Sequence, residues 1–160
     1  MVIKNRFNAQ DFDRISRQIY IAIQNERKLT KRPLEYIKKN LKKGNIYLAL
    51  DRDDQVIGFI IREKIISNYY EIKSWYISPQ NRHSGIGSKL MKLATTVNSF
   101  KYLSVTFQSE MIYILKHFGF KRIPLISLPI NVLIKYIITR NWVSILTHIF
   151  IKKSYLLLKS

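Results

Sequence analysis

The stretch from Ile77 to Val97 constrains the fold of this chain more than any other part of the sequence. It begins as the end of an apolar run, passes through a polar loop containing Gly85 and Gly87, and continues with apolar residues at helical spacing. Main-chain N–H groups converge where a strand, a glycine-containing loop and a helix start meet, and the helix dipole favours negative charge there. Arg82 adds a positive charge. The sequence therefore predicts an anion-binding loop.

Two common phosphate-binding loops are excluded by the residues after Gly87. The Walker pattern requires a lysine directly after its second glycine, but Ser88 follows Gly87 here. The dinucleotide fingerprint requires a third glycine at the position of Leu90. A strand-to-helix turn whose glycines only allow tight packing is the alternative interpretation of this loop.

The run Ile77–Gly87, which reads ISPQNRHSGIG, resembles the pyrophosphate loop of the Gcn5-related N-acetyltransferases (GNAT), which cradles coenzyme A. The family form is roughly Val-x-Pro-x-x-Arg-Gly-x-Gly-x-Gly, and His83 replaces its first glycine. A second stretch, His117–Phe120, resembles the family's Lys-x-Gly-Phe signature. The resemblance implies a coenzyme A site lined by Ile77, Arg82, His83, Ser84, Gly85, Ile86, Gly87 and Ser88.

The order of the expected elements is also that of the family. Hydrophobic periodicity, caps and turn residues predict strands at 2–7, 45–50, 55–61, 69–77, 102–107, from 120 onward and at 130–138, with helices at 11–26, 33–43, 86–98 and 110–118. The resemblance implies a mixed α/β fold with a central, mostly antiparallel, twisted sheet flanked by helices. Gly58, inside a strand, indicates a bulge or a close backbone approach. The acetyltransferase domain is expected over residues 1–138, and residues 139–160 are expected to form a basic, apolar extension, helical and packed on it.

Composition narrows the class of protein. A chain of 160 residues is expected to form one domain with a real core. The absence of cysteine excludes disulfides, thiolate zinc sites and a cysteine nucleophile. No long apolar run follows the N-terminus, so a secretory signal is not expected. The expected location is the cytoplasm, with peripheral placement at a membrane as a further option.

The net charge of +18 favours a polyanionic partner, either RNA or an anionic membrane surface. The segment Arg27–Lys43 holds eight basic residues and the single acid Glu35. The solvated face of two helices is the alternative reading. Residues 124–160 contain five basic residues and no acid. That tail predicts either a last strand and a packed helix, or a segment that rests on an anionic membrane.

The resemblance implies transfer of an acyl group, usually acetyl, from coenzyme A to a primary amine by direct attack. Glu71 is the candidate general base because it is the only acid between residues 64 and 109 and lies six residues before Ile77. A glutamate at this offset acts as base in the histone-acetylating branch of the family. A salt bridge from Glu71 to Lys73, or proton removal through a water chain, is the alternative.

The general acid departs from the family pattern. Family members place a tyrosine four residues before the glycine of Gly-Phe, and that position is Leu115 here. Tyr113 is two residues earlier, about 200° around a helix, so its side chain is expected to point away. Either Tyr113 donates the proton through a shifted helix, or the thiolate leaves without it. No spacing of His, Asp and Glu predicts a metal. A basic docking module on this fold, with weak or no turnover, is the second function class.

Overall fold

The computed structural model describes residues 1–106, 108–138 and 155–160. Its helices and strands follow in the order β1 (Val2–Lys4), α1 (Phe12–Asn25), α2 (Leu34–Lys42), β2 (Ile46–Leu50), β3 (Val56–Ile66), β4 (Tyr69–Ile77), α3 (Ile86–Ala94), β5 (Lys101–Thr106), α4 (Ser109–His117), β6 (Lys121–Arg122), α5 (Ile130–Ile138) and β7 (Tyr155–Lys159). The strand order of the sheet is β1-β2-β3-β4-β5-β7-β6. The mixed α/β fold with a mostly antiparallel sheet is therefore confirmed.

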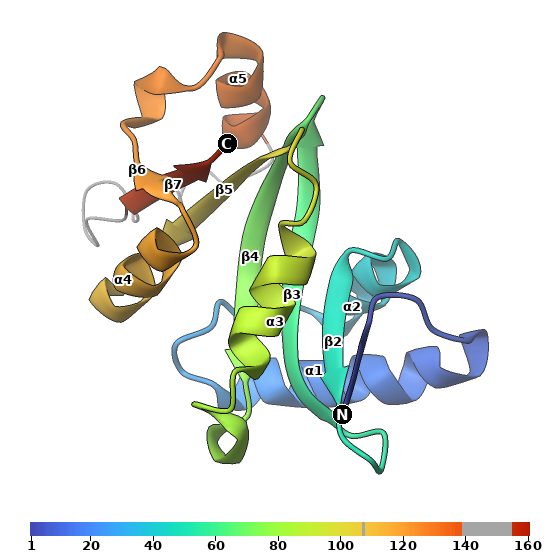
Figure 1. The fold of residues 1–160 in the computed structure, drawn as a ribbon. Coiled ribbons are helices and arrows are strands. Elements are labelled where there is room, and N and C mark those ends of the chain that lie inside the picture. Colours follow the sequence, from blue (N-terminus) through green and yellow to red (C-terminus); the bar gives the residue numbers. More distant parts are fainter. Residues whose placement is uncertain (107, 139–154) are drawn as a thin grey trace. The chain divides into compact units, whose positions relative to one another are not determined.

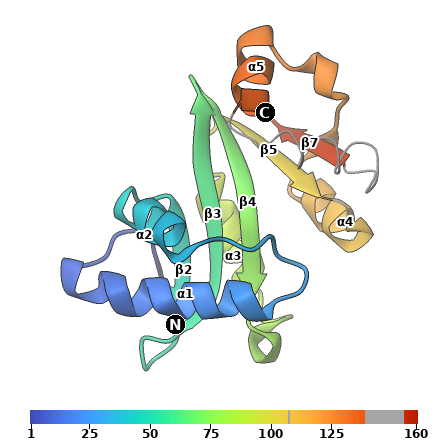
Figure 2. The same cartoon turned by 180° about the vertical axis from the view of Figure 1, so that it is seen from behind.

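The chain divides into two compact units, and the long strands β3 and β4 contribute to both. The first unit holds Met1–Glu63 and Lys73–Thr96, and the second holds Lys64–Ile72 and Val97–Ser160. In the first unit, β1 pairs with β2 and β2 pairs with β3, each antiparallel. Helices α1 and α2 cover one face of these strands and α3 covers the other, as the two opposite views show (Figures 1 and 2).

The core of the first unit follows from the helical spacing of α1. Ile15, Ile19 and Ile23 recur every four residues, so they share one face of the helix, and each is at most 1% exposed. That face packs against a cluster that includes Ile37 of α2 and Phe59 of β3. All five residues of β2 are buried, which gives this strand a continuous apolar sequence rather than an alternating one.

Gly58 marks a close approach between β3 and the end of β4. A Cβ atom at Gly58 would lie 2.7 Å from Cδ1 of Ile77 and 3.1 Å from the carbonyl oxygen of Tyr76. The register between β2 and β3 also shifts between Ala49 and Leu50, next to Gly58. Both parts of the sequence interpretation hold, because the close approach and the bulge occur at the same place.

In the second unit, β5 is central. It pairs in parallel with the first four residues of β4, Tyr69–Ile72, and antiparallel with β7, whose other edge pairs with β6. Helix α5 buries Val132 and Tyr136 in a cluster with Leu103 of β5 and Leu156 of β7. These helical and strand residues form the apolar core of this unit.

Two predicted elements near the end of the chain are wrong. Residues 130–138 form α5 and not a strand, and residues 155–159 form β7 and not a helix. Both segments are apolar almost throughout, so composition alone does not separate them. Tertiary packing decides: residues 130–138 bury one helical face, whereas residues 155–159 pair with a strand on each side. Residues 139–154 lie outside the described residues, so the predicted domain boundary at residue 138 stays a prediction.

Glu63 of β3 and Lys73 of β4 form a partly buried ion pair in the first unit. Burial by itself raises the pKa of the Glu63 carboxyl. The hydrogen bond and charge of Lys73, with hydrogen bonds from Tyr36 and Asn40, outweigh burial and hold that pKa below its ordinary value of 4.5. A lowered carboxyl pKa stabilises the fold above the unfolded-state pKa, and this stabilisation is lost as the pH falls through the folded-state pKa.

We expect Glu63→Gln to lower the free energy of unfolding at neutral pH by roughly 1–3 kcal/mol, because Lys73 loses its charged partner. The variant should also lose less stability than the parent when the pH falls from about 5 to about 3. Urea unfolding at both pH values measures this. Glu35→Gln is the control, because the Glu35 side chain is 85% exposed and its removal should change little. An unaltered pH dependence in Glu63→Gln would contradict the assignment.

Candidate active site

The loop between β4 and α3 is held by its own hydrogen bonds. The N–H of Ser78 donates to the carbonyl of Ile57 at 2.9 Å, which ties the loop to β3. A short 3-10 turn, Pro79–Asn81, follows, and the Asn81 amide donates to Ser78 Oγ at 2.8 Å. Ser84 Oγ in turn donates to the carbonyl of Asn81 at 2.5 Å. The backbone of the loop is therefore fixed before the helix begins.

Two residues of the loop adopt the left-handed backbone region. Gly85, the residue that caps α3, has a φ of 78°, and His83 has a φ of 63°. His83 stands where the family pattern carries a glycine, and its backbone adopts the conformation for which glycine is favoured. Histidine is among the residues that tolerate this region best. The departure from the family sequence therefore leaves a glycine-like loop conformation in place.

The start of α3 presents main-chain donors to the loop. The first intrahelical hydrogen bond runs from the N–H of Lys89 to the carbonyl of Gly85, at 3.1 Å. The N–H groups of Ile86, Gly87 and Ser88 precede it and have no acceptor inside the helix. No side chain caps this end of α3. Three donors and the positive end of the helix dipole thus converge, as an anion site requires.

The two glycines of the loop have different surroundings. A Cβ atom at Gly85 would meet nothing within 4 Å, so the space above the helix start is open. A Cβ atom at Gly87 would lie 3.1 Å from Cζ2 of Trp75, a residue of β4. Gly87 therefore lets α3 pack closely on the strand, and Gly85 leaves room for a ligand at the donors. The packing role that the sequence left open is therefore present at Gly87, and the anion-binding role stays a prediction.

Arg82 is paired within the protein. Its guanidinium donates to a carboxylate oxygen of Glu26 at 2.9 Å, and its Nε donates to the carbonyl of Ile77 at 3.3 Å. Burial raises the pKa of the neighbouring Tyr76 hydroxyl, the charge of Glu26 raises it further, and the charge of Arg82 opposes this. Glu26 ends α1 and is 56 residues from Arg82, so no sequence signal identified it. The loop charge is thus offset by a carboxylate from α1.

The candidate base lies on β4 in the second unit. Glu71 is 6% exposed and stands opposite Leu103 in the parallel register with β5. Lys73, which the sequence offered as an alternative partner, forms an ion pair with Glu63. A buried carboxylate on a strand that leads to the loop is compatible with a general base, and this role stays a prediction.

Helix α4 places the two candidate acid positions on opposite sides. Leu115 is fully buried, whereas Tyr113 is 67% exposed. The Tyr113 ring lies 4.3 Å from the ring of His117, one helical turn further on. The burial pattern follows the helical spacing that sets these two residues about 200° apart. Proton donation by Tyr113 stays a prediction.

Several residues of the basic segment Arg27–Lys43 have structural partners. Lys31 donates to three carbonyls at the end of α1, those of Ile23, Gln24 and Glu26, at 2.7–3.1 Å. Lys38 forms an ion pair with Asp13 at 2.8 Å, and the hydrogen bond between them lowers the pKa of Asp13 and raises that of Lys38. These contacts account for part of the positive charge as helix capping and pairing.

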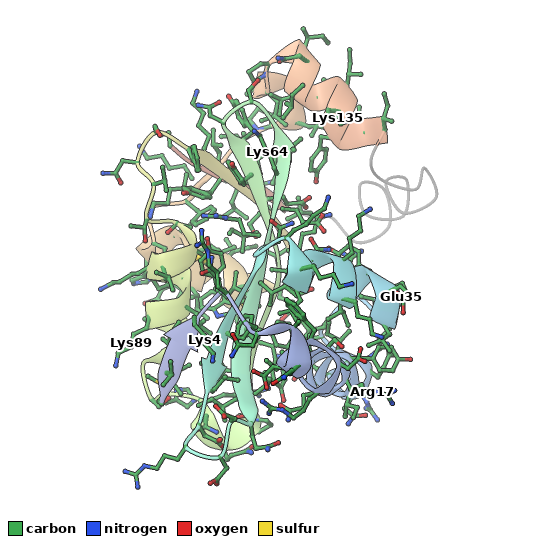
Figure 3. The ribbon with its side chains drawn as sticks, turned by 90° about the vertical axis from the view of Figure 1, so that its right-hand side faces the viewer. Lys4, Arg17, Glu35, Lys64, Lys89 and Lys135 are labelled. Carbon is green, nitrogen blue, oxygen red and sulfur yellow. The ribbon has the colours of Figure 1, made fainter. Side chains whose placement is uncertain are left out.

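The remaining lysines of α2 lie on its outer side. Lys39 and Lys42 of α2 and Lys43 at its C-terminal cap are exposed. Arg17 of α1 and Glu35 of α2 also extend outward (Figure 3). Within residues 1–106, 108–138 and 155–160, no three His, Asp or Glu side chains are grouped to hold a metal ion. Among the described helices, none has the length and apolar character needed to cross a bilayer.

Comparisons with known proteins bear on the fold and the family of this chain. No curated protein matches the sequence. The fold is similar to that of Rv2747 from Mycobacterium tuberculosis, solved with CoA and NLQ (16% identity, 99% of this chain and 98% of that chain, TM-score 0.67). It is also similar to a GNAT-family acetyltransferase from Staphylococcus aureus Mu50 (18% identity, 99% of this chain and 97% of that chain, TM-score 0.66). A third similar structure is that of Naa50 from Arabidopsis thaliana, solved with the bisubstrate analogue CoA-Ac-MVNAL (16% identity, 99% of this chain and 97% of that chain, TM-score 0.64).

At these identities the structural likeness shows a shared fold. The sequence itself carries the assignment further, because the profile of the acetyltransferase (GNAT) domain matches residues 42–122. That span runs from the end of α2 to β6 and includes the whole anion-binding loop. The chain therefore belongs to the GNAT acetyltransferase family.

Proposed function

We propose that this protein transfers an acyl group, most simply acetyl, from coenzyme A to a primary amine, by direct attack within a ternary complex. The observation that carries the proposal is the start of α3, where three main-chain N–H groups follow a loop with left-handed residues at His83 and Gly85. Solved proteins of the same fold carry coenzyme A or a bisubstrate analogue of it, which supports the same co-substrate here.

The loop, the end of β4 and Glu71 have separate roles in this proposal. The backbone of 82–88 binds the pyrophosphate of the co-substrate, and main-chain groups near Ile77 orient its thioester carbonyl. Glu71 accepts the proton that the amine loses as it attacks. Little further chemistry is required, because a thioester is already activated and the main task is to hold two reactants together.

Return of a proton to the departing thiolate has two open routes. In one route, the Tyr113 hydroxyl supplies the proton. Tyr113→Phe removes this hydroxyl and keeps the ring. In the other, the thiolate leaves unprotonated, because a thiol is acidic enough to leave as an anion near neutral pH. Tyr113→Phe separates them: a lower kcat with an unchanged KM for acetyl-CoA favours the first route, and unchanged kinetics favour the second.

A second candidate function is a basic docking module with weak or no turnover. The exposed lysines on α2, Lys39, Lys42 and Lys43, favour it, because they form one side of a helix whose other side is buried. A polyanion bound there would be released steeply as salt is added. Thiol release from acetyl-CoA over a panel of amines, peptides and aminoacyl-tRNA distinguishes this function from catalysis.

We expect isothermal titration to show acetyl-CoA binding with a dissociation constant below about 1 mM. Arg82→Ala should weaken this binding roughly tenfold, because Arg82 both ties the loop to Glu26 and Ile77 and supplies its charge. Glu26→Gln separates these contributions: weaker binding in this variant indicates that the ion pair positions the loop, and tighter binding indicates that Glu26 competes for the charge of Arg82. Absence of binding by the parent protein would overturn the proposed function.

A further inference from the structure

Helix α5 exposes a row of isoleucines on the side opposite to its buried face. Val132 and Tyr136 are buried in the core of the second unit. The exposed row consists of Ile126, in the turn before the helix, and Ile130, Ile134 and Ile138, with exposed fractions of 84%, 69%, 50% and 67%. We call these four residues the isoleucine row.

The spacing places the three helical members of the row on one side of α5. Residues four apart in a helix differ by about 40° around its axis, so Ile130, Ile134 and Ile138 lie within about 80° of one another. Single exposed apolar side chains are ordinary on protein surfaces, but a contiguous apolar row marks an interaction site. Isoleucine has no polar atom in its side chain, so the partner of this row must offer an apolar surface.

The C-terminal part of the chain, from residue 111 onward, also carries charge of one sign. Residues 111–160 contain no Asp or Glu and eight basic residues: Lys116, Lys121, Arg122, Lys135, Arg140, Lys152, Lys153 and Lys159. Lys121 and Arg122 are exposed on β6, and Lys135 is exposed on α5 itself (Figure 3). The partner of the isoleucine row must therefore be negatively charged as well as apolar.

We propose that the isoleucine row docks this protein on the surface of an anionic membrane. A lipid interface offers both acyl chains for the isoleucines and acidic headgroups for Lys135 of the same helix and for the other basic residues of 111–160. A second copy of the chain would bring two positively charged surfaces together with no acid from residues 111–160 to offset them. A nucleic acid would neutralise the charge but leave the isoleucines in water. This inference goes beyond the proposed acyltransferase activity and does not depend on it.

The absence of cysteine from the chain makes a direct test possible. Ile134→Cys and Ile21→Cys each create one labelling site for an environment-sensitive fluorophore such as NBD. Ile21 is the matched control, because it is an exposed isoleucine, 56% accessible, on α1 rather than in the row. With vesicles of phosphatidylcholine containing about a quarter phosphatidylglycerol, emission at position 134 should shift to the blue and brighten several-fold. Emission at position 21 should not change with either kind of vesicle, and pure phosphatidylcholine should give a much weaker response at position 134.

A second experiment replaces two apolar side chains of the row and measures vesicle binding. We expect the double variant Ile130→Ser and Ile138→Ser to bind anionic vesicles at least tenfold more weakly in sedimentation assays, and Ile21→Ser to bind like the parent. Thermal unfolding confirms that each variant is folded. Unchanged vesicle binding in the double variant would overturn the proposal, since charge alone would then account for the interaction. A blue shift at position 134 without vesicles would also overturn it, because the row would then be covered by another copy or by residues of this chain.

Discussion

Gly85→Trp should abolish detectable acetyl-CoA binding, a loss of at least about a hundredfold in affinity. The new side chain would begin in the open space at Gly85, where an added Cβ meets nothing within 4 Å, directly beside the first N–H groups of α3. An indole there fills the volume that an anion must occupy to reach those donors. Isothermal titration with acetyl-CoA measures the loss, and its size exceeds what any single side-chain contact in the loop supplies.

The control for Gly85→Trp is Gly44→Trp. Gly44 has a similar left-handed φ of 67°, and its added Cβ would make an ordinary 3.6 Å contact with the Asn5 carbonyl. It follows α2, so this variant carries the same backbone strain away from the loop. His83→Gly is a second control that restores the family's glycine and should bind as the parent does. Equal loss of binding in Gly44→Trp, with both variants folded, would mean that Gly85→Trp acts through strain.

Glu71→Gln should lower kcat by about a hundredfold or more and leave the KM for acetyl-CoA near that of the parent. The substitution preserves the size of a side chain that is only 6% exposed, so the fold should persist. The amide cannot accept the proton that the attacking amine loses. The acidic limb of the pH profile for kcat/KM, which reports deprotonation of the base, should disappear in the variant. Thiol release with the best amine of the panel measures both.

Glu63→Gln is the matched control for this experiment. Glu63 is also a partly buried glutamate on a strand, but it belongs to the ion pair with Lys73. It should change stability with little effect on kcat, whereas Glu71→Gln should do the reverse. If kcat of Glu71→Gln stays within about threefold of the parent, Glu71 is structural and the proton leaves by a chain of waters.

Local pattern predicted the fold well wherever one periodicity dominated. The strand at 69–77 has the same bounds in the structure, and the helix predicted at 11–26 occupies Phe12–Asn25. The first segment is rich in aromatic and β-branched residues, and the second places its apolar residues at helical spacing. Local pattern failed at 130–138 and 155–159, where nearly every residue is apolar and only the neighbouring strands decide between helix and strand.

In the candidate site, too, local residues could be predicted from the sequence and long-range contacts could not. The loop residues, Ile77 to Ser88, are contiguous, so their spacing and the family resemblance together identified them as a candidate site. The same resemblance identified Leu115 as the position of the missing tyrosine. Glu26 could not be found in this way, because its ion pair with Arg82 joins elements that are 56 residues apart. The charge state of the loop depends on that tertiary contact, and no local motif encodes it.

The position of β7 has a consequence for how this chain acquires its structure. β7 is the last strand in the sequence, yet it lies between β5 and β6 and pairs with both. During synthesis, β5 and β6 are therefore made before β7, and the edge of each that pairs with β7 stays open until then. Open edges recruit other chains, so the nascent second unit is most prone to aggregate until Tyr155–Lys159 arrive. Any shortening that removes these five residues leaves both edges open at once.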